Sequence, residues 1–387
     1  MKVDVGVVGG GIGGLSVALA LAGDGHRVTI LERAERFATV GAGIVLTPNA
    51  VHGLAALGVD LAGAGRVLAR MEVRAAQGDP LNVVDLQELA RRHGPTYGIA
   101  RPVLHARLAA ALPPSVEVVV RAPVSSVRQT GDGVVVELPG TQRQFDVVVA
   151  ADGLRSAVRP LLGGPKELRY SGTTCWRGIL PFPAGDAAVE AWGAGTRVGV
   201  VPVDEVSAYY YLVRSAPPGE PGPASVDLLR AVFAGYRGIA GEVVRALTQL
   251  PPLHHDLFEL DRPFWGRSRA LLLGDAAHAM TPNQGQGAAM AIEDAAVLVA
   301  ALRGGVAGVA RRYADVRGRR VRRVQLTSRR IGALGHLRGA RARRLRDAGM
   351  RLAPAGSGTR AVQRLIAPGI ALAALSAPSI PPPPGAP

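Results

Sequence analysis

Three glycines near the start of the chain stand at a spacing that suits the binding of a diphosphate. Gly9, Gly11 and Gly14 fit the pattern G-x-G-x-x-G and follow the short β-branched run 3–8. In this pattern the first glycine permits a tight turn, the second lets the backbone approach a pyrophosphate, and the third lets a helix pack closely on the strand. The free N–H groups at the start of that helix attract the anion. We therefore expect a dinucleotide to bind here.

A carboxylate at the end of the next strand supports this prediction. Glu32 follows the apolar run 27–31 and stands 23 positions after Gly9, where it can accept hydrogen bonds from ribose hydroxyls. The pattern serves FAD as well as NAD. An acid at this position disfavours a ribose 2′-phosphate, so we do not expect NADP at this first site. A glycine-rich loop that served packing alone would not need Glu32.

A second ligand-facing stretch lies at 272–289. Asp275 directly follows a buried strand, where a carboxylate can accept hydrogen bonds from a ribityl chain, although by itself it would be an ordinary helix cap. The turn at 285–287 presents bare backbone at the start of a helix, where a negative charge is stabilised by roughly 0.3–1 kcal/mol. A reduced flavin carries such a charge. His278 has no His or Cys neighbour at metal-ligand spacing, so a hydrogen-bonded structural role is favoured.

No side-chain acid or base can be assigned from the sequence. It contains no recognisable Ser/His/Asp or Cys/His constellation and no obvious pair of carboxylates. This absence fits a protein whose bound cofactor supplies the chemistry, but it is not evidence for one.

The first 165 residues alternate between strands and helices, as a dinucleotide-binding sheet does. After the opening β-α-β unit, the patterns predict a helix over 51–70, strands over 71–86 and a helix from Arg101. A buried strand over 145–150 then leads directly into Asp152. This order predicts a dinucleotide-binding sheet that is interrupted by antiparallel insertions.

The predicted secondary structure changes between residues 170 and 260. Strand-like runs there predict an antiparallel sheet, and two helices are expected over 224–250. A short strand at 270–273 and a helix over 287–302 then return to the first sheet. The overall expectation is a mixed α/β protein with a second, antiparallel-sheet domain inserted into a Rossmann-like one.

Charge and cysteine usage narrow the class of protein. The formal net charge is +15, but fifteen arginines and a single acid, Asp315, lie between Arg303 and Arg346. Apolar residues recur there at helical intervals, so we expect an amphipathic helix with a solvated basic face; binding to an acidic surface, a nucleic acid or an acidic protein partner is the alternative. The single cysteine, Cys175, and the lack of an apolar leader or membrane span favour a cytoplasmic protein.

These motifs together resemble the single-component, or group A, FAD-dependent aromatic hydroxylases, which have the para-hydroxybenzoate hydroxylase fold. The resemblance rests on the glycine pattern with Glu32 and Arg33, on Asp152-Gly153 with the residues up to Arg159, and on the run from Gly274-Asp275 to Ala289. It covers about residues 1–350. The opening differs in having Gly10 where that family often carries alanine.

The resemblance implies a fold class and domain boundaries. We expect an α/β Rossmann-like FAD-binding domain over 1–165, a substrate-binding sheet domain over 166–262, and a return to the FAD-binding domain over 263–302. A basic helical region over 303–370 and a Pro-rich tail over 371–387 would complete the chain.

The resemblance also implies roles for single residues. The glycine turn, Glu32 and Arg33 would hold the ADP half of FAD, Asp275 its ribityl-pyrophosphate region, and the residues from Gly285 to Ala289 would line its isoalloxazine. Asp152 would belong to a motif linked to both FAD and NAD(P)H binding. The full set of expected cofactor-binding residues is Gly9, Gly11, Ile12, Gly13, Gly14, Glu32, Arg33, Gly43, Arg101, Val124, Asp152, Gly274, Asp275, Pro282, Gly285, Gln286, Gly287, Ala288 and Ala289.

The substrate-side candidates are fewer. Arg177 could pair with a carboxylate or phenolate, or could form a structural salt bridge. Tyr209, Tyr210 and Tyr211 lie on one predicted strand, so the first and third should face one side and Tyr210 the other. Core packing is the alternative for each tyrosine. Val45 could also line the pocket but offers no polar group, which suggests an apolar or polycyclic substrate.

The expected activity is therefore hydroxylation or epoxidation by an FAD-dependent monooxygenase. The resemblance implies NADPH or NADH as transient reductant, dioxygen as co-substrate and a flavin C4a-hydroperoxide as oxygen donor. A flavoprotein reductase or dehydrogenase on the same scaffold is one alternative, and a non-catalytic flavin-binding or partner-binding protein is another. We expect no nucleic-acid partner and no metal, and either a monomer or a homodimer.

Overall fold

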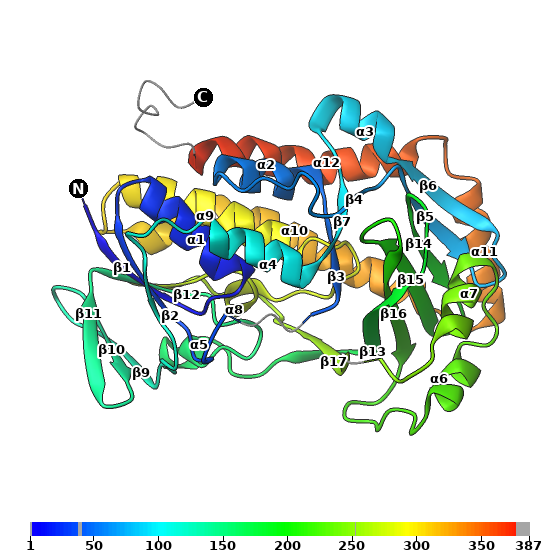
Figure 1. Ribbon diagram of the computed structural model, residues 1–387, viewed down its shortest axis with the longest axis horizontal. Coiled ribbons are helices and arrows are strands. Elements are labelled where there is room, and N and C mark those ends of the chain that lie inside the picture. Colours follow the sequence, from blue (N-terminus) through cyan, green and yellow to red (C-terminus); the bar gives the residue numbers. More distant parts are fainter. Residues whose placement is uncertain (1, 38–40, 252, 377–387) are drawn as a thin grey trace.

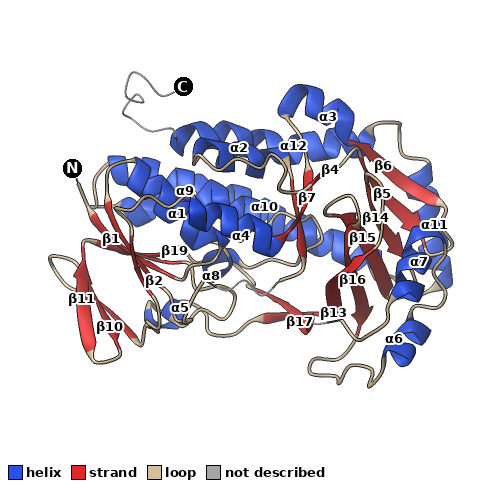
Figure 2. Ribbon diagram, in the orientation of Figure 1, coloured by secondary structure: helices blue, strands red, loops and turns tan. Residues whose placement is uncertain are grey.

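The computed structural model describes residues 2–37, 41–251 and 253–376. One half of the molecule is built on a six-stranded sheet (Figures 1 and 2). Its strands β1, β2, β8, β12 and β19 pair in parallel, and β18 adds an antiparallel edge. The strands, in order across the sheet, are β18 (Gly266–Arg267), β19 (Ala270–Leu272), β12 (Val147–Ala150), β1 (Asp4–Val8), β2 (Arg27–Leu31) and β8 (Glu117–Val119).

Helices α1 (Ile12–Gly23) and α9 (Gly287–Arg303) pack together in the same apolar cluster as one face of this sheet. A three-stranded antiparallel sheet and the short helix α5 (Val158–Leu161) share an apolar cluster with β12 and β19. That small sheet consists of β9 (Ser126–Gln129), β10 (Val134–Leu138) and β11 (Thr141–Phe145). The predicted β-α-β opening, the insertions and the return at α9 are thus confirmed.

The other half is built on a seven-stranded, mostly antiparallel sheet (Figure 1). Two of its strands come from the early segment 70–85, because β5 pairs in parallel with β14. Helices α6 (Val226–Val232) and α7 (Gly238–Ala246) cover one face, as predicted. In order, the strands are β17 (Leu253–Glu259), β13 (Arg169–Pro181), β16 (Ser207–Ser215), β15 (Thr196–Pro202), β14 (Ala187–Trp192), β5 (Arg70–Ala75) and β6 (Pro80–Asp85).

A third small sheet lies between the two halves. It is formed by β3 (Gly43–Leu46), β7 (Tyr97–Ala100) and β4 (Arg66–Val67). Helices α2 (Pro48–Ala56) and α4 (Arg101–Ala110) contact this sheet, and α3 (Leu86–His93) contacts β5. The helix expected over 51–70 is wrong beyond Ala56. Gly58 adopts φ +74° there, and the Val59 N–H returns to the carbonyl of Leu54, which closes the helix.

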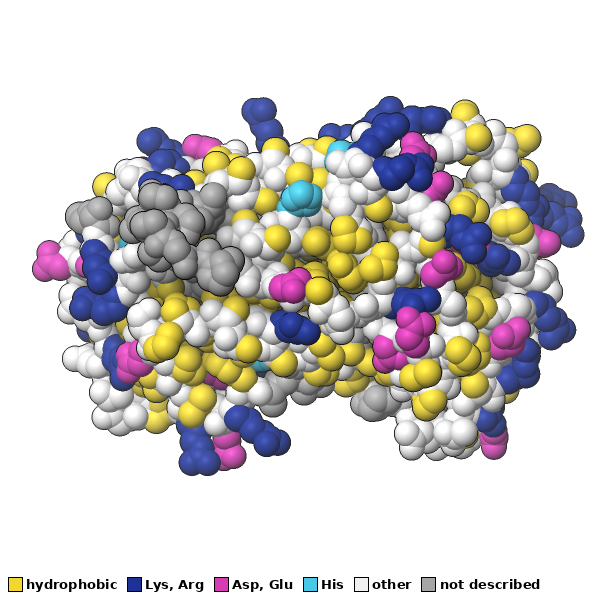
Figure 3. Space-filling model, turned by 45° about the horizontal axis from the view of Figure 1, so that its top comes forward, with side chains coloured by type: hydrophobic (Ala, Val, Ile, Leu, Met, Phe, Trp, Pro, Cys, Tyr) yellow, Lys and Arg dark blue, Asp and Glu magenta, His cyan; other side chains and the backbone are white. Residues whose placement is uncertain are grey.

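Helix α10 (Val309–Gly335) runs beside α9, and α11 (Ala340–Arg351) and α12 (Ser357–Ala373) follow it. A short 3₁₀ turn (Ala374–Ser376) ends the described part. The expectation of a solvated basic face on this segment is wrong in part, because Arg317 is fully buried and Arg320 and Arg329 pair with acids. On the face drawn in Figure 3, basic and acidic side chains are interspersed.

The predicted Pro-rich tail over 371–387 lies outside the described residues from 377 onward. None of the helices in the described part combines the length and apolar composition that a membrane crossing requires. The described residues also hold no cluster of three or more His, Cys, Asp or Glu side chains that could bind a metal.

Candidate functional site

The glycine turn between β1 and α1 has the geometry of an anion cradle. Gly9 adopts φ +100°, and a Cβ there would lie 2.7 Å from the carbonyl oxygen of Ala151. A Cβ on Gly14 would lie 1.9 Å from the Gly9 carbonyl oxygen, so helix and turn touch. A Cβ on Gly11 would meet nothing within 4 Å, and no side chain caps the helix there. The first and third glycines are thus needed for packing, whereas Gly11 borders open space.

Glu32 holds this turn from the side of β2. Its Oε2 accepts a hydrogen bond of 2.7 Å from the N–H of Gly10, and its Oε1 accepts one of 2.8 Å from Ala34. The carbonyl of Gly10 accepts a 2.7 Å hydrogen bond from Nε2 of His105 on α4. Each carboxylate oxygen keeps a lone pair for a ribose hydroxyl. The side chain of Arg33 is exposed beside it.

The residues that follow Asp152 hold the backbone of the stretch 272–289 in place. Asp152 Oδ2 accepts hydrogen bonds from the N–H groups of Ala157 and Val158, so this carboxylate caps the turn before α5. Arg159, 2% exposed, donates to the carbonyls of Leu154, Pro165 and Ala276. Burial lowers the pKa of Arg159 from its usual value. The Asp152 carboxylate and Arg159 therefore fix the backbone beside α8 (Asp275–His278).

Helix α9 anchors the beginning of the stretch 272–289. Asp294 Oδ2 accepts hydrogen bonds from the N–H of Gly274 at 3.0 Å and from Nε2 of His278 at 2.6 Å. His278 is 1% exposed, which agrees with the structural role favoured for it. Asp275 instead is exposed, and its Oδ1 lies 4.0 Å from the position of a Cβ on Gly287. This carboxylate is free to accept hydrogen bonds from a ligand.

The side chain of Gln286 points away from the open side of its turn. It is 1% exposed, donates to Thr47 Oγ1 at 2.9 Å and accepts from Asn49 Nδ2 at 3.0 Å. Asn49 also donates to Glu293, which pairs with the buried Arg317. Gln286 can therefore meet a ligand only through its backbone. The turn itself stays open, because α9 begins there without a side-chain cap.

The seven-stranded sheet presents a polar aromatic face to this region. Arg177 on β13 stands opposite Tyr211 on β16, and Tyr209 lies on the same face. Tyr210 packs under α6 and α7, so the predicted alternation of the three tyrosines is confirmed. Gly43 lies against Tyr209: a Cβ there would be 2.4 Å from the Tyr209 Cβ. Strand β3 thus brings the cofactor half and the sheet together.

Arg101 connects these parts electrostatically. It is within interaction range of Asp275, Arg177 and Tyr209, and burial lowers its pKa. Burial also raises the pKa of Tyr209 to about 12, so the phenol is neutral near pH 7. The Nε atoms of Arg101 and Arg177 are buried and have no hydrogen-bond partner in the described part of the chain. Two unsatisfied cationic donors at one place favour a bound ligand with acceptor atoms.

The remaining expected residues are spread around this region. Val45 is half-buried and lies 4.0 Å from the position of a Cβ on Gly285. Ile12 and Ala289 belong to the core, so only their backbone could reach a ligand. Gly13 packs on Leu273 and Ala291. Val124 and Ala288 are half-buried and Pro282 is exposed.

Several polar residues near the site were not predicted from the sequence. His255 on β17 lies opposite Cys175, on the face that carries Arg177, and burial followed by the charge of Arg177 lowers its pKa to about 4. Glu190 and Arg197 on the neighbouring strands form an ion pair below Tyr211. Strand alternation would have placed His255 and Arg177 on one face, had the register of β17 been known.

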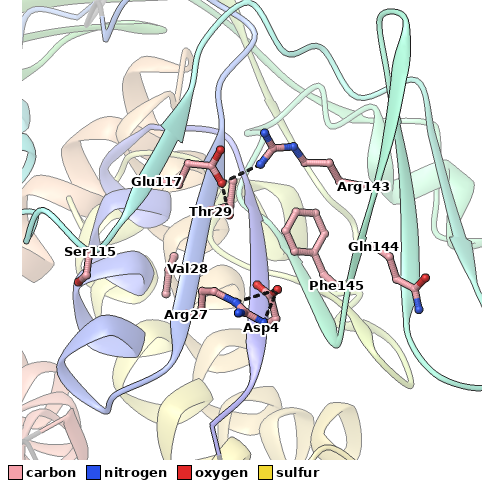
Figure 4. A pocket seen from close by; sticks show the side chains of 9 residues that line it. All are labelled: Asp4, Arg27, Val28, Thr29, Ser115, Glu117, Arg143, Gln144 and Phe145. Carbon is pink, nitrogen blue, oxygen red and sulfur yellow. Dashed lines mark hydrogen bonds and ion pairs between the residues drawn. The ribbon is translucent and has the colours of Figure 1, made fainter.

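A surface depression of about 500 Å³ lies elsewhere, at the amino ends of β1, β2 and β8 (Figure 4). Dinucleotides bind at the carboxyl ends of such strands. Its charged groups are already paired, Arg27 with Asp4 and Arg143 with Glu117. It contains none of the expected site residues.

Comparison with known proteins agrees with this geometry. A family described as "FAD binding domain" matches residues 2–315. The aurachin C monooxygenase/isomerase of Stigmatella aurantiaca is 35% identical over 362 residues, which cover 89% of this chain and 93% of that protein. The 2-heptyl-3-hydroxy-4(1H)-quinolone synthase of Pseudomonas aeruginosa is 38% identical over 305 residues, 76% of this chain and 78% of its own.

The chain belongs to the FAD-dependent aromatic hydroxylases. Among solved structures, HpxO of Klebsiella pneumoniae complexed with FAD and uric acid is 29% identical, with a TM-score of 0.82 over 95% of this chain and 97% of its own. The fold is thus the para-hydroxybenzoate hydroxylase type, and the protein is an FAD-dependent monooxygenase. The residues present fit FAD: the backbone at Gly11 borders open space, the carboxylate of Asp275 is exposed, and the buried Nε of Arg101, which is within interaction range of Asp275, has no hydrogen-bond partner in the described part of the chain.

Proposed function

We propose that this monooxygenase, reduced by NADH or NADPH, inserts one oxygen atom of dioxygen into an aromatic or polycyclic small molecule. When bound, FAD supplies hydride acceptance and oxygen activation, through the C4a-hydroperoxide that the family resemblance implies. The protein's own tasks are to hold the cofactor, orient the substrate and exclude water.

The cofactor tasks divide between two turns. The N–H groups at the start of α1 and the carboxylate of Glu32 would hold the ADP half, with Gly11 leaving room for the pyrophosphate. The uncapped start of α9 at 285–287 would stabilise negative charge on the reduced isoalloxazine. Asp275 would accept hydrogen bonds from the ribityl chain, and Arg101 would donate to the cofactor from its buried Nε.

The observation that carries the substrate proposal is the buried, unpaired Nε of Arg177 on the face that also holds Tyr209 and Tyr211. A guanidinium so placed favours an aromatic compound with an ionisable oxygen or a carboxylate. Val45 and Gly43 would form the apolar wall opposite. In support, similar proteins are named for a hydroxylated quinolone and for urate.

The test couples three readouts on one panel of probes: urate, 6-hydroxynicotinate and 2-heptyl-4(1H)-quinolone. With ¹⁸O₂, one probe should accelerate NADH or NADPH oxidation, oxygen uptake should match it, and the product should contain one ¹⁸O atom. Oxidation of the nicotinamide together with reduction of a probe, without ¹⁸O in any product, would support the reductase alternative and contradict the proposal.

A further inference from the structure

One arginine joins the substrate-facing sheet to the turn that borders the flavin. Arg197 lies on β15 and is 3% exposed. Its Nη1 donates to Glu190 Oε1 at 3.0 Å, its Nη2 to Asn283 Oδ1 at 2.6 Å, and its Nε to His336 Nε2 at 2.9 Å. Each arm of the guanidinium is thus bound to a different element: β14, the segment before α9, and the end of α10.

The substrate-side end of this chain of contacts is Tyr211. Its hydroxyl donates to the second oxygen of Glu190. Its ring lies directly on the backbone of Gly199, where a Cβ would be 1.9 Å from the ring Cζ. Burial, followed by the charge of Glu190, raises the pKa of Tyr211 well above its ordinary value, so the phenol remains a donor. The ring of Tyr211 is therefore fixed both by packing and by Glu190.

The cofactor-side end is Asn283, two residues before Gly285. Its Nδ2 donates to the carbonyl of Ser328 at 2.9 Å and to Thr281 Oγ1 at 3.0 Å. Gly332 on α10 leaves space for this amide, since a Cβ there would be 2.6 Å from Nδ2. The amide is thereby held with its oxygen toward Arg197, and a displaced guanidinium would leave that half-buried oxygen without its partner.

His336 completes the arrangement in one protonation state. Because the guanidinium can only donate, Nε2 of His336 must accept, and Nδ1 carries the proton toward Ser215 Oγ at 3.1 Å. Burial, followed by the charge of Arg197, lowers the pKa of His336 to about 3. The contacts therefore do not titrate near neutral pH, and they act as a fixed brace.

We propose that Arg197 is a positioning residue that couples the Tyr211 side of the substrate site to the turn over 283–287. The inference rests on the proposed function, which assigns the end of that turn, residues 285–287, to the isoalloxazine. Loss of any arm of the guanidinium would loosen the turn while leaving the glycine turn near Gly11 untouched. Since coupling is reciprocal, contact of a substrate with Tyr211 would also tighten the hold on the isoalloxazine.

The test compares the binding of FAD with the binding of ADP, which is one half of the FAD molecule. ADP reports only the half at the glycine turn, whereas FAD reports both. In titrations of the apoprotein, Arg197→Met should weaken FAD about tenfold or more, the loss expected for a charged hydrogen bond, and should change ADP affinity less than about twofold. The FAD affinity of Arg197→Lys should lie between those of the wild type and Arg197→Met, because lysine keeps the charge but lacks the forked donor geometry of the guanidinium.

Tyr211→Phe keeps the proposal testable if the arginine variants do not fold. It removes only the hydrogen bond from Tyr211 to Glu190, so the affinity for FAD should fall by about two- to fivefold while the affinity for ADP stays unchanged. Tyr236→Phe is the matched control, since it removes a buried tyrosine hydrogen bond to Thr196 on the helix side of the same strand and should affect neither ligand.

Equal losses of FAD and ADP affinity, or no loss of either, would overturn the coupling and leave the proposed function intact. A wild-type protein that binds ADP but gains nothing from the flavin half would instead contradict the proposed function itself.

Discussion

The two turns that we propose to hold the cofactor are built in opposite ways. The turn at 9–14 owes its shape to side chains that are absent, because its backbone atoms touch at Gly9 and Gly14. The turn at 283–287 owes its shape to side chains that are present and buried, among them Arg197 and, through Gln286 and Asn49, Glu293. The first is therefore a local structure, whereas the second depends on α2, α9, α10 and β15 together.

Because of this difference, substitutions at the two turns should affect ligand affinity and folding stability differently. At the first turn a small side chain can block a ligand without disturbing the protein, provided that it projects into open space. At the second turn a substitution leaves buried charges unpaired, so stability falls together with affinity.

The largest loss should follow from Arg317→Met. Arg317 is fully buried and pairs with both Glu293 and Asp294 at 2.6 Å, so the variant removes the guanidinium that these two buried carboxylates share and leaves them only Arg320 and His278 as ion-pair partners. We expect the free energy of unfolding to fall by about 3–5 kcal/mol, measured by chemical denaturation. Arg319→Met, on the exposed side of the same helix, is the control and should leave it unchanged.

Two glycine substitutions test the first turn. Gly14→Ala should lower the free energy of unfolding by about 1–3 kcal/mol, because its Cβ would meet the Gly9 carbonyl. Gly11→Ala should fold as the wild type, since Gly11 has φ −74° and open space around it, yet should weaken FAD by about tenfold or more. Unchanged FAD affinity in Gly11→Ala would show that the pyrophosphate lies elsewhere.

Acid should weaken the contacts that Asp294 makes with Gly274 and His278. Burial alone raises the pKa of Asp294, but the charges of His278 and Arg317 outweigh it and lower the pKa to about 2. A depressed folded pKa contributes stability that is complete above the unfolded value of about 4 and is lost as the pH falls toward 2. This loss should amount to about 2 kcal/mol in the pH dependence of unfolding and should be absent in Asp294→Asn.

The smallest effect is expected for Glu32→Gln. The amide oxygen can replace one of the two acceptors for Gly10 and Ala34, so folding should be nearly unaffected. Loss of a charged acceptor for the ribose should weaken ADP and FAD to the same extent, by about 1 kcal/mol. Titration calorimetry with both ligands would detect an unequal loss, which would place Glu32 outside the ADP half.

The same contrast explains what the sequence could predict. The glycine turn, Glu32 and α1 lie within one short stretch, so spacing alone indicates their arrangement. Gln286 was expected at the cofactor, but its side chain turns into a buried network with Thr47 and Asn49, which are more than 230 positions away. Likewise the arginines of α10 suggested a solvated face, because their acidic partners lie in other elements. Long-range pairing of polar groups has no local signature.

The most direct test of this account is a parallel titration of the wild-type apoprotein with FAD and with ADP. If the turn at 9–14 holds the ADP half and the turn at 283–287 holds the isoalloxazine, FAD should bind at least about tenfold more tightly than ADP, and ADP should compete with it for the same site. Equal affinities, or binding of both ligands at once, would contradict the assignment of the two turns.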